Sequence, residues 1–149
     1  MELKIVPVTE ENRSEAEALS LLPEQVDFIE SVQECMEEAD QLSGWRPVAI
    51  MADGEMVGFS MYGYIEEPRY NRLWFDRLLI DRRFQGRGYG RRAAECILET
   101  MKRDYPHMDI YLSAYEENSG AIRLYESLGF VRTGELDSKG EKIMAFHVK

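Results

Sequence analysis

Three glycines at alternate positions are the clearest candidate for a ligand-binding loop. They occur in the run Gln85-Gly86-Arg87-Gly88-Tyr89-Gly90, which follows the apolar residues Leu78-Leu79-Ile80 and precedes apolar residues at helical spacing. Glycine permits positive φ and a close backbone approach, and the start of a helix offers unpaired N–H groups to an anion. The surrounding arginines, Arg82, Arg83, Arg87, Arg91 and Arg92, suit phosphate groups, so we expect a ligand that carries a pyrophosphate.

Two common phosphate-binding loops do not match this run. A P-loop ends in Gly-Lys-Ser/Thr, and this loop has neither the lysine for a phosphate nor the hydroxyl for magnesium. A dinucleotide fingerprint has the spacing G-x-G-x-x-G near the start of a domain, whereas this run reads G-x-G-x-G in mid-chain. Taken alone, the glycines also fit a plain turn.

The loop and a second motif together resemble one enzyme family. Residues 85–90 resemble the Q/R-x-x-G-x-G/A signature of the GNAT family of acetyl-CoA-dependent N-acetyltransferases. The run Asn118-x-x-Ala121-x-x-Leu124-Tyr125-x-x-x-Gly129-Phe130 resembles the second signature of that family, at the expected distance. Shorter segments, among them Ile29-Glu30-Ser31, Asp76-Arg77 and Gly134-Glu135-Leu136-Asp137, are similar to the bacterial spermine/spermidine acetyltransferases within the family.

The resemblance implies where acetyl-CoA binds. In the family, the central strand splays away from the next strand, and the pantetheine arm lies in the gap and hydrogen-bonds like an added strand. The resemblance places Leu78, Leu79 and Ile80 on that gap, with backbone groups of Leu78 and Ile80 as partners of the pantetheine. It assigns the pyrophosphate to residues 85–91, which are Gln85, Gly86, Arg87, Gly88, Tyr89, Gly90 and Arg91. Asn118 would contact the pantetheine from the other side, although its position also suits a simple helix cap.

The resemblance also implies a general acid and a candidate base. Tyr125 would fall near the thioester sulfur, where its hydroxyl protonates the departing thiolate; a tyrosine packed in the core is the alternative. A primary amine has a pKa near 10, so removing its proton at pH 7 costs roughly 4 kcal/mol, and a base or a water relay would help. Asp76 stands where some family members carry a carboxylate base, and strand alternation predicts that it shares a face with Leu78. An ion pair of Asp76 with an arginine is the alternative.

Acidic residues are concentrated in the N-terminal part of the chain. The net charge is −10, and residues 1–44 carry twelve acidic and two basic residues. Between positions 24 and 42, acidic residues recur at helical spacing with no basic residue among them: Asp27, Glu30, Glu34, and Glu37 or Glu38. Either solvent or a bound polycation then balances these charges. We expect Glu30, Glu34 and Glu37 to bind distal ammonium groups of a polyamine, and the acidity argues against nucleic acid as a partner. Tyr62 would add a cation–π face for the amine, or simply pack in the core.

The elements expected around these residues define an α/β (α+β) fold. Strands that come mostly as hairpins, with helices between them, predict a mixed, largely antiparallel sheet of six to seven strands flanked by about four helices. Asp53-Gly54 predicts a hairpin turn, and Gly129 predicts the end of a helix. The expected strands are 3–8, 47–51, 56–64, 73–80, 110–114, 130–132 and 142–148. The expected helices are a short one capped by Thr9, a second at 24–42 that Pro23 precedes, a third from the glycine loop to about 104, and a fourth at 119–128.

Length and composition narrow the class of protein. The 149 residues suit a single domain, 1–149, that buries its own core. The two cysteines fall in helical patterns and no signal peptide or membrane span is recognisable, so we expect a cytoplasmic protein with no membrane partner. No Cys/His cluster has metal-ligand spacing, so we expect no metal. Dimers are common in the family that the chain resembles, which favours a homodimer.

These observations lead to one expected function and two alternatives. We expect acetyl transfer from acetyl-CoA to a primary amine of spermine, spermidine or a similar polycation. No serine or cysteine in the motifs is placed to carry the acyl group, so direct attack in a ternary complex is expected. The alternatives are the same reaction on an aminoglycoside, a small amine or a protein N-terminus, and a non-catalytic acyl-CoA-binding module.

Overall fold

The computed structural model describes residues 3–20, 31–66 and 71–148, which form one seven-stranded sheet with the order β1-β2-β3-β4-β5-β7-β6. Neighbouring strands are antiparallel except for β4 and β5, which are parallel. The strands are β1 (Leu3–Pro7), β2 (Arg46–Ala52), β3 (Glu55–Ile65), β4 (Arg72–Ile80), β5 (Ile110–Ala114), β6 (Val131–Leu136) and β7 (Lys142–Phe146). The α-helices of the described residues are α1 (Arg13–Glu17), α2 (Val32–Gln41), α3 (Tyr89–Asp104) and α4 (Ser119–Ser127), with a 3-10 turn at Arg82–Phe84. The mixed, largely antiparallel α/β fold is therefore confirmed.

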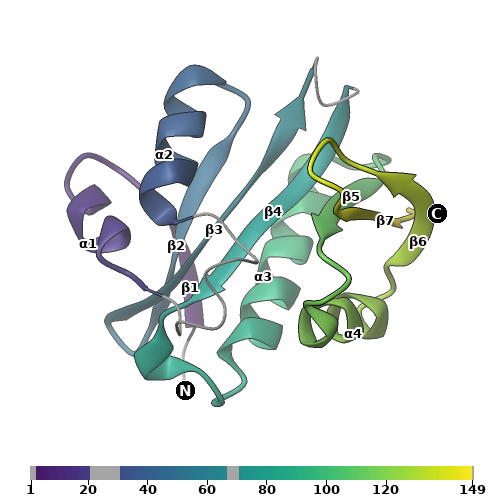
Figure 1. Ribbon diagram of the computed structural model, residues 1–149. Coiled ribbons are helices and arrows are strands. Elements are labelled where there is room, and N and C mark those ends of the chain that lie inside the picture. The colour runs from purple at the N-terminus through teal and green to yellow at the C-terminus, as the bar shows by residue number, and fades with distance from the viewer. Residues whose placement is uncertain (1–2, 21–30, 67–70, 149) are drawn as a thin grey trace.

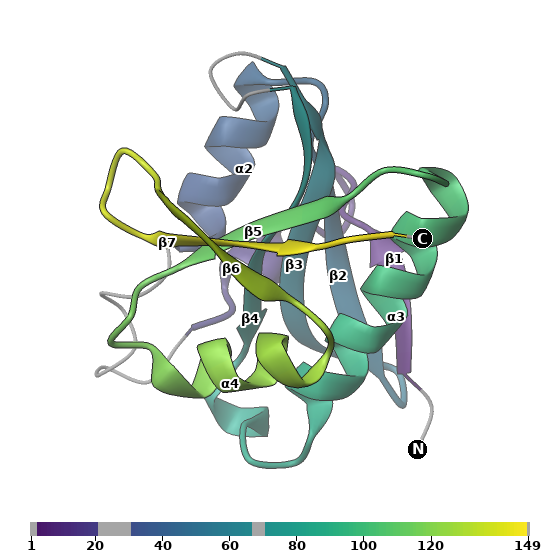
Figure 2. The same ribbon diagram turned by 90° about the vertical axis from the view of Figure 1, so that its right-hand side faces the viewer.

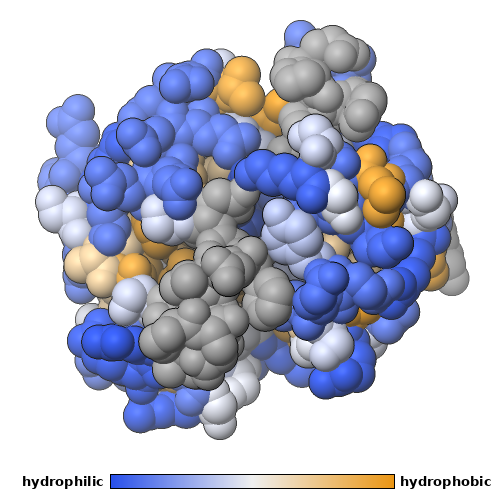
Figure 3. All heavy atoms as spheres, in the orientation of Figure 1, coloured by the Kyte–Doolittle hydropathy of each residue, from blue (hydrophilic) through white to orange (hydrophobic). Residues whose placement is uncertain are grey.

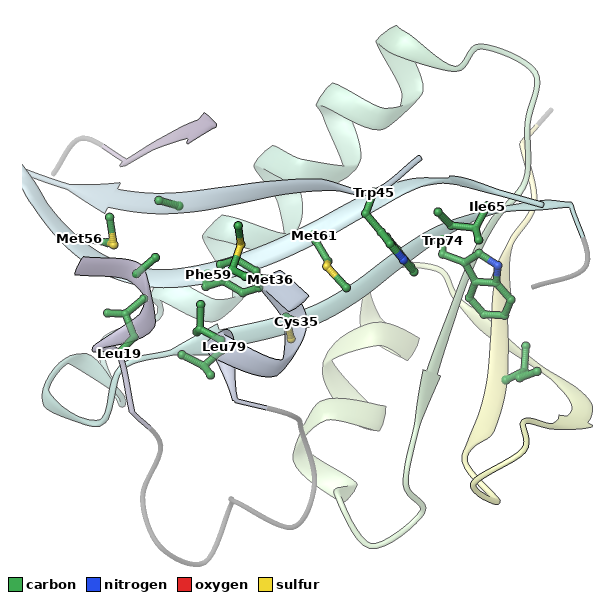
Figure 4. Close-up of a cluster of buried hydrophobic side chains, with 14 residues drawn as sticks. Leu19, Cys35, Met36, Trp45, Met56, Phe59, Met61, Ile65, Trp74 and Leu79 are labelled. Carbon is green, nitrogen blue, oxygen red and sulfur yellow. The ribbon is translucent and has the colours of Figure 1, made fainter. Parts of the chain in front are cut away.

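Helices cover both faces of the sheet (Figures 1 and 2). Helices α1 and α2 lie on one face, which is called the α2 face below. There, Leu19, Cys35 and Met36 pack in one cluster with Phe59 of β3 (Figure 4). Helices α3 and α4 lie on the other, called the α3 face, where the apolar side of α3 packs on Leu73 and Phe75 of β4. The sheet thus has a buried layer of apolar side chains on each face and separates the α2 face from the α3 face.

The turns expected from glycine are present. Asp53 and Gly54 both have positive φ, 50° and 86°, and connect β2 to β3 as a tight hairpin. Gly129 has a φ of 106° directly after Leu128, the C-cap residue of α4, as expected for a glycine that ends a helix. These two predictions are confirmed.

The starts of the first two helices differ from the prediction. Helix α1 begins at Arg13 after Asn12, because the Asn12 side chain accepts a hydrogen bond from the Thr9 N–H and holds residues 9–12 in a turn. Helix α2 begins at Val32, because Ser31 is extended (φ −64°, ψ 158°) and forms a capping box with Glu34. A continuous helix over 24–42 is therefore wrong at Ser31, and residues 24–30, with Pro23, lie outside the described residues.

Strands β4 and β5 separate soon after they meet. They pair only at Leu73 with Ile110 and at Trp74 with Tyr111, although β4 continues to Ile80 and β5 to Ala114. The sheet is therefore open between the later residues of these two strands, as the family resemblance implied.

A β-bulge on β4 lies beside this opening. Asp76 pairs with Met61 and Leu79 with Phe59, so Arg77 and Leu78 together oppose one residue of β3, and Arg77 takes a φ of +59°. Because the bulge interrupts the alternation of side chains, Asp76 lies on the α2 face with Met61, whereas Leu78 packs on the α3 face. The expectation that Asp76 and Leu78 share a face is wrong for this reason.

Candidate active site

A pocket of about 640 Å³ lies on the α3 face, beside the opening between β4 and β5. Its lining combines the end of β4, the glycine loop with the start of α3, and the first two turns of α4. The lining residues are Leu78, Ile80, Phe84, Gln85, Gly86, Gly88, Tyr89, Gly90, Asn118, Gly120, Ala121, Leu124 and Tyr125. Two segments that are far apart in the sequence, 85–90 and 118–125, thus form the walls of one cavity.

The glycine loop has the backbone conformation that an anion cradle needs. Gly86 and Gly88 have φ values of +78° and +82°, and no protein atom lies within 4 Å of the place where a Cβ would stand on either residue. Gly88 precedes the first residue of α3, so the unpaired N–H groups and the positive end of a 16-residue helix are directed toward the loop. The loop is therefore open to a phosphate group, and side chains at these two positions would strain the backbone.

The end of β4 contributes two of its three predicted residues to the pocket. Leu78 and Ile80 line it, and the Ile80 carbonyl accepts a hydrogen bond of 2.9 Å from the side chain of Gln85. That bond ties the glycine loop to the strand. Leu79 is buried in the cluster on the α2 face, so its side chain packs in the core rather than in the pocket.

Helix α4 brings Asn118 and Tyr125 to the opposite wall. Asn118 occupies the N-cap position, yet its side chain makes no capping hydrogen bond, so the reading as a simple cap is not supported. Tyr125 packs edge-to-face on Phe75 and Phe130, at ring-centroid distances of 6.0 Å for each. Burial, and to a lesser degree the charge of Asp76, raises the pKa of the Tyr125 phenol, so the hydroxyl keeps its proton at neutral pH.

Two arginines of the predicted cofactor set lie outside the lining of the pocket. The Arg91 guanidinium donates a hydrogen bond of 2.7 Å to the Ser127 hydroxyl of α4, which fastens α3 to α4. Arg87 is exposed, with its guanidinium 5.6 Å from the centre of the Phe84 ring. Arg87 belongs to the glycine loop, and Arg91 lies in the first turn of α3.

Sequence reasoning did not assign Phe84, Gly120, Ala121 or Leu124 to the site. Ala121 and Leu124 belong to the second motif, and their helical spacing from Asn118 and Tyr125 could have placed them on the same side of α4. Phe84 is the last residue of the 3-10 turn after β4 and carries no signal in its local sequence.

Asp76 lies at the α2-face side of the opening and is paired with an arginine. It is 7% exposed, and its Oδ2 atom lies 2.7 Å from Nη1 of Arg77. The Arg77 guanidinium also lies 3.0 Å from Oε2 of Glu38 on α2 and stands 6.0 Å from the centre of the Trp45 ring. The ion pair that was the alternative for Asp76 is therefore present, and the charge of Asp76 also contributes to the raised pKa of Tyr125.

Tyr62 is part of the core. It is 6% exposed and packs in the cluster on the α3 face, and burial raises the pKa of its phenol. Its position opposite Phe75 in the sheet keeps the ring away from the α2 face, where Asp76 lies. The expected cation–π contact with an amine is therefore replaced by the alternative, core packing.

The acidic residues of α2 have more partners than the sequence indicated. Glu34 and Glu37 are exposed, and the α2 side of the surface is mostly hydrophilic (Figure 3). The Glu34 carboxylate caps its own helix through the Ser31 N–H at 3.0 Å, and Asp40 is paired with Arg13 at 2.9 Å. Glu38 is paired with Arg77 of β4. Basic residues of other elements therefore balance part of the negative charge of α2, although residues 24–42 contain no basic residue. Glu30 lies outside the described residues.

A comparison with protein families identifies the class of the molecule. The model of the acetyltransferase (GNAT) family matches residues 12–130. The chain therefore belongs to this family, and it is an acyltransferase.

Individual relatives and solved structures are similar to the chain in sequence or in fold. The chain is 39% identical to the spermine/spermidine N(1)-acetyltransferase of Bacillus subtilis (strain 168), over 97% of either sequence. It is 38% identical, over the same shares, to the probable spermine N(1)-acetyltransferase of Bacillus subtilis subsp. natto. In fold it is similar to the aminoglycoside acetyltransferase AAC(6')-Ib in complex with coenzyme A, with a TM-score of 0.81 at 20% identity over 98% of this chain and 95% of that one. A chimera of the spermidine N-acetyltransferase SpeG from Vibrio cholerae and hSSAT has a TM-score of 0.72 at 21% identity, over 99% of this chain and 96% of that one.

No helix within residues 3–20, 31–66 and 71–148 has both the length and the apolar character of a membrane span. Over the same residues, no group of three or more potential ligand side chains is arranged to hold a metal ion.

Proposed function

We propose that the chain transfers an acetyl group from acetyl-CoA to a primary amine of spermine, spermidine or a similar polyamine. The observation that carries the proposal is the pocket on the α3 face, whose walls are the two segments that match the GNAT signatures. The substrate class is supported by the two relatives, whose names are those of spermine and spermidine acetyltransferases.

The pocket fits acetyl-CoA on physical grounds. Its glycine loop leaves room for an anion at Gly86 and Gly88, and the first N–H groups of α3 supply donors for a pyrophosphate. The edge of β4 beyond Trp74 has no strand beside it, so its backbone groups are available to an extended arm that lies in the gap. Asn118 adds a side-chain amide on the far wall.

Tyr125 is proposed as the general acid. Its raised pKa keeps the phenol protonated, and it lines the same pocket as Leu78 and Asn118. A positioned hydroxyl at this place gives its proton to the leaving sulfur, which avoids the release of a thiolate into a partly dry site.

The amine is proposed to enter from the α2 face. Asp76 stands on that side of the opening, while the pocket lies on the other, so the two substrates would approach each other through the gap between β4 and β5. Simultaneous binding from opposite sides supports direct attack in a ternary complex. Distal ammonium groups of a long amine would then reach exposed carboxylates such as Glu37, while the reacting nitrogen lies near Tyr125.

A panel of amines tests this proposal. Release of the CoA thiol is measured at a fixed acetyl-CoA concentration with spermine, spermidine, a short monoamine, an aminoglycoside and a peptide with a free N-terminus. The proposal predicts the highest kcat/KM for spermine or spermidine. A higher value for the aminoglycoside or the peptide reassigns the substrate, and binding of acetyl-CoA without turnover on any amine supports an acyl-CoA-binding module.

We further propose a homodimer in the cytoplasm. The edge strand β6 leaves Val131 and Leu136 about half exposed, at 50% and 54%, which is unusual for apolar side chains on an unpaired edge. Sedimentation at micromolar concentration measures the mass, and a monomer at every concentration contradicts the dimer.

A further inference from the structure

One carboxyl group at the opening between β4 and β5 has no part in the function proposed above. Glu141 directly precedes β7, and its Oε2 atom accepts a hydrogen bond of 2.9 Å from the Ser113 hydroxyl of β5. Its N–H donates to Oδ1 of Asp137 at 2.8 Å, and its carbonyl accepts from the Asp137 N–H at 3.0 Å. The turn between β6 and β7 therefore holds the Glu141 carboxyl against β5 in a defined position.

The register of the sheet places this carboxyl across the opening from Asp76. Trp74 and Tyr111 are the last pair of β4 and β5, and both pack on the α2 face. Two residues further along each strand come Asp76 and Ser113, which therefore lie on the same face on opposite sides of the opening. Glu141, bonded to Ser113, thus belongs to the wall that faces Asp76.

The charged groups around Glu141 favour its neutral form. Burial is the largest cause, and a side-chain hydrogen bond with Asp137 of the adjacent turn is the next. The bond from Ser113 acts in the opposite direction, and the negative charges of Asp137 and of Asp76 on β4 add smaller contributions. Together they raise the pKa of Glu141 to about 8. No arginine or lysine of the described residues forms an ion pair with it, whereas Asp76 has Arg77 as a fixed partner.

We propose that Glu141 takes the proton from the reacting ammonium in the opening between β4 and β5, an assignment that rests on the acetyl transfer proposed above. The N–H bond breaks, an O–H bond forms on the Glu141 carboxylate, and the electron pair left on nitrogen attacks the acetyl carbon. Tyr125 then gives its proton to the leaving sulfur and regains one from the nitrogen of the new amide. Glu141, which is only partly buried, returns its proton to water after turnover.

The pH dependence of Glu141→Gln tests the assignment. For the wild type, kcat/KM for spermidine is expected to rise with pH up to about 8, where Glu141 is ionised, and then to level. The variant keeps an acceptor for the Ser113 hydroxyl but has no base, so its kcat/KM at pH 7 should fall about 10²–10⁴-fold. Because the variant then depends on the free amine, its rate should continue to rise toward the pKa of the substrate, near 10.

Two further variants keep the test decisive. Ser113→Ala removes the bond that lowers the pKa of Glu141, so the rise of its kcat/KM should move to higher pH. Glu99→Gln, which neutralises an exposed carboxylate on α3, should leave the profile unchanged. If Glu141→Gln levels at the same pH as the wild type, Glu141 is not the proton acceptor and only this assignment fails. If the wild type releases no thiol with any amine, the proposed acetyl transfer fails with it.

Thermal unfolding gives a readout that is independent of activity. A carboxyl whose pKa is raised in the folded state binds more protons there than in the unfolded chain, so its contribution to stability is full below about pH 4 and is lost as pH rises through about 8. The Tm of Glu141→Gln relative to the wild type should therefore increase from pH 5 to pH 9. A difference that stays constant over this range contradicts the environment described for Glu141.

Discussion

The two sides of the opening between β4 and β5 are built in different ways. On the α3 face, most of the residues that line the pocket come from two continuous segments, 85–90 and 118–125, and the end of β4 adds Leu78 and Ile80. On the α2 face, the charged groups come from three elements that are distant in the sequence: Asp76 and Arg77 from β4, Glu38 from α2, and Glu141 from the turn before β7. A binding loop can thus be encoded locally, whereas an arrangement of single charges exists only after the sheet has formed.

The two faces also differ in the charge of the ligand that they favour. The α3 face offers N–H groups and a helix dipole, which favour an anion. The α2 face offers carboxylates, which favour ammonium groups but also stabilise the protonated amine that cannot attack. The proposed role of Glu141 resolves this conflict, because this carboxyl has no ion pair with a basic side chain among residues 3–20, 31–66 and 71–148 and would accept the proton that the other carboxylates help to retain.

Of the substitutions on the two faces, Tyr125→Phe should lower kcat the most. If the Tyr125 hydroxyl is the proton donor, as proposed, its loss should lower kcat about 10²–10⁴-fold. Affinity for acetyl-CoA, measured by calorimetry, should stay nearly unchanged, because the ring still packs on Phe75 and Phe130. Native kcat in a variant whose chemical step limits the rate removes the role as an acid.

Gly88→Val tests whether the loop binds through its backbone. The variant strains a residue with φ +82° and blocks the approach of the ligand, so acetyl-CoA affinity should fall roughly a hundredfold or more, the worth of one or two charge-assisted hydrogen bonds. Gly134→Val is the matched control, since Gly134 has a φ of +87°, equally open surroundings and no place in the pocket. Both variants should lose similar stability. Equal affinities of the two variants for acetyl-CoA show that the loop is only a turn.

The two faces also differ in how far the sequence predicts them. The glycine loop, the hairpin at Asp53-Gly54 and the end of α4 at Gly129 follow from glycine conformations that a short window contains. The bulge at Arg77 does not, because its cause is a register shift against β3, and strand alternation then misplaces Asp76. Glu141 shows no motif at all, since its surroundings come from β4, β5 and the β6–β7 turn.

Asp76→Asn should affect the amine and spare the cofactor. Removing this carboxylate beside the opening should lower kcat/KM for spermidine about 10- to 150-fold, the worth of one charge-assisted hydrogen bond, with acetyl-CoA affinity unchanged. Glu38→Gln is the control, because it removes the other partner of Arg77 without touching the group that acts on Tyr125. It should lower stability while changing kcat/KM far less. Equal losses of kcat/KM in the two variants indicate that only the ion-pair network matters.

Glu34→Gln with Glu37→Gln should give the smallest effect. The glutamine at position 34 retains an acceptor for the Ser31 N–H, so the helix cap is kept. If these carboxylates attract distal ammonium groups, KM for spermine should rise a few-fold, at roughly 0.2–1 kcal/mol for each exposed pair, and KM for a short monoamine should not change. High salt should weaken wild-type binding more than binding by the variant. Equal changes of KM for both amines mean that these carboxylates are only solvated surface groups and do not bind the substrate.

Binding of the two substrates from opposite faces is tested most directly by initial rates with acetyl-CoA and spermidine varied together. Because the sheet lies between the pocket and the acidic side and is open between the later residues of β4 and β5, both substrates should occupy the protein at once. The double-reciprocal plots are then expected to intersect, with CoA as a competitive inhibitor against acetyl-CoA but not against spermidine. Parallel lines, or competition of CoA with spermidine, would contradict binding from two sides.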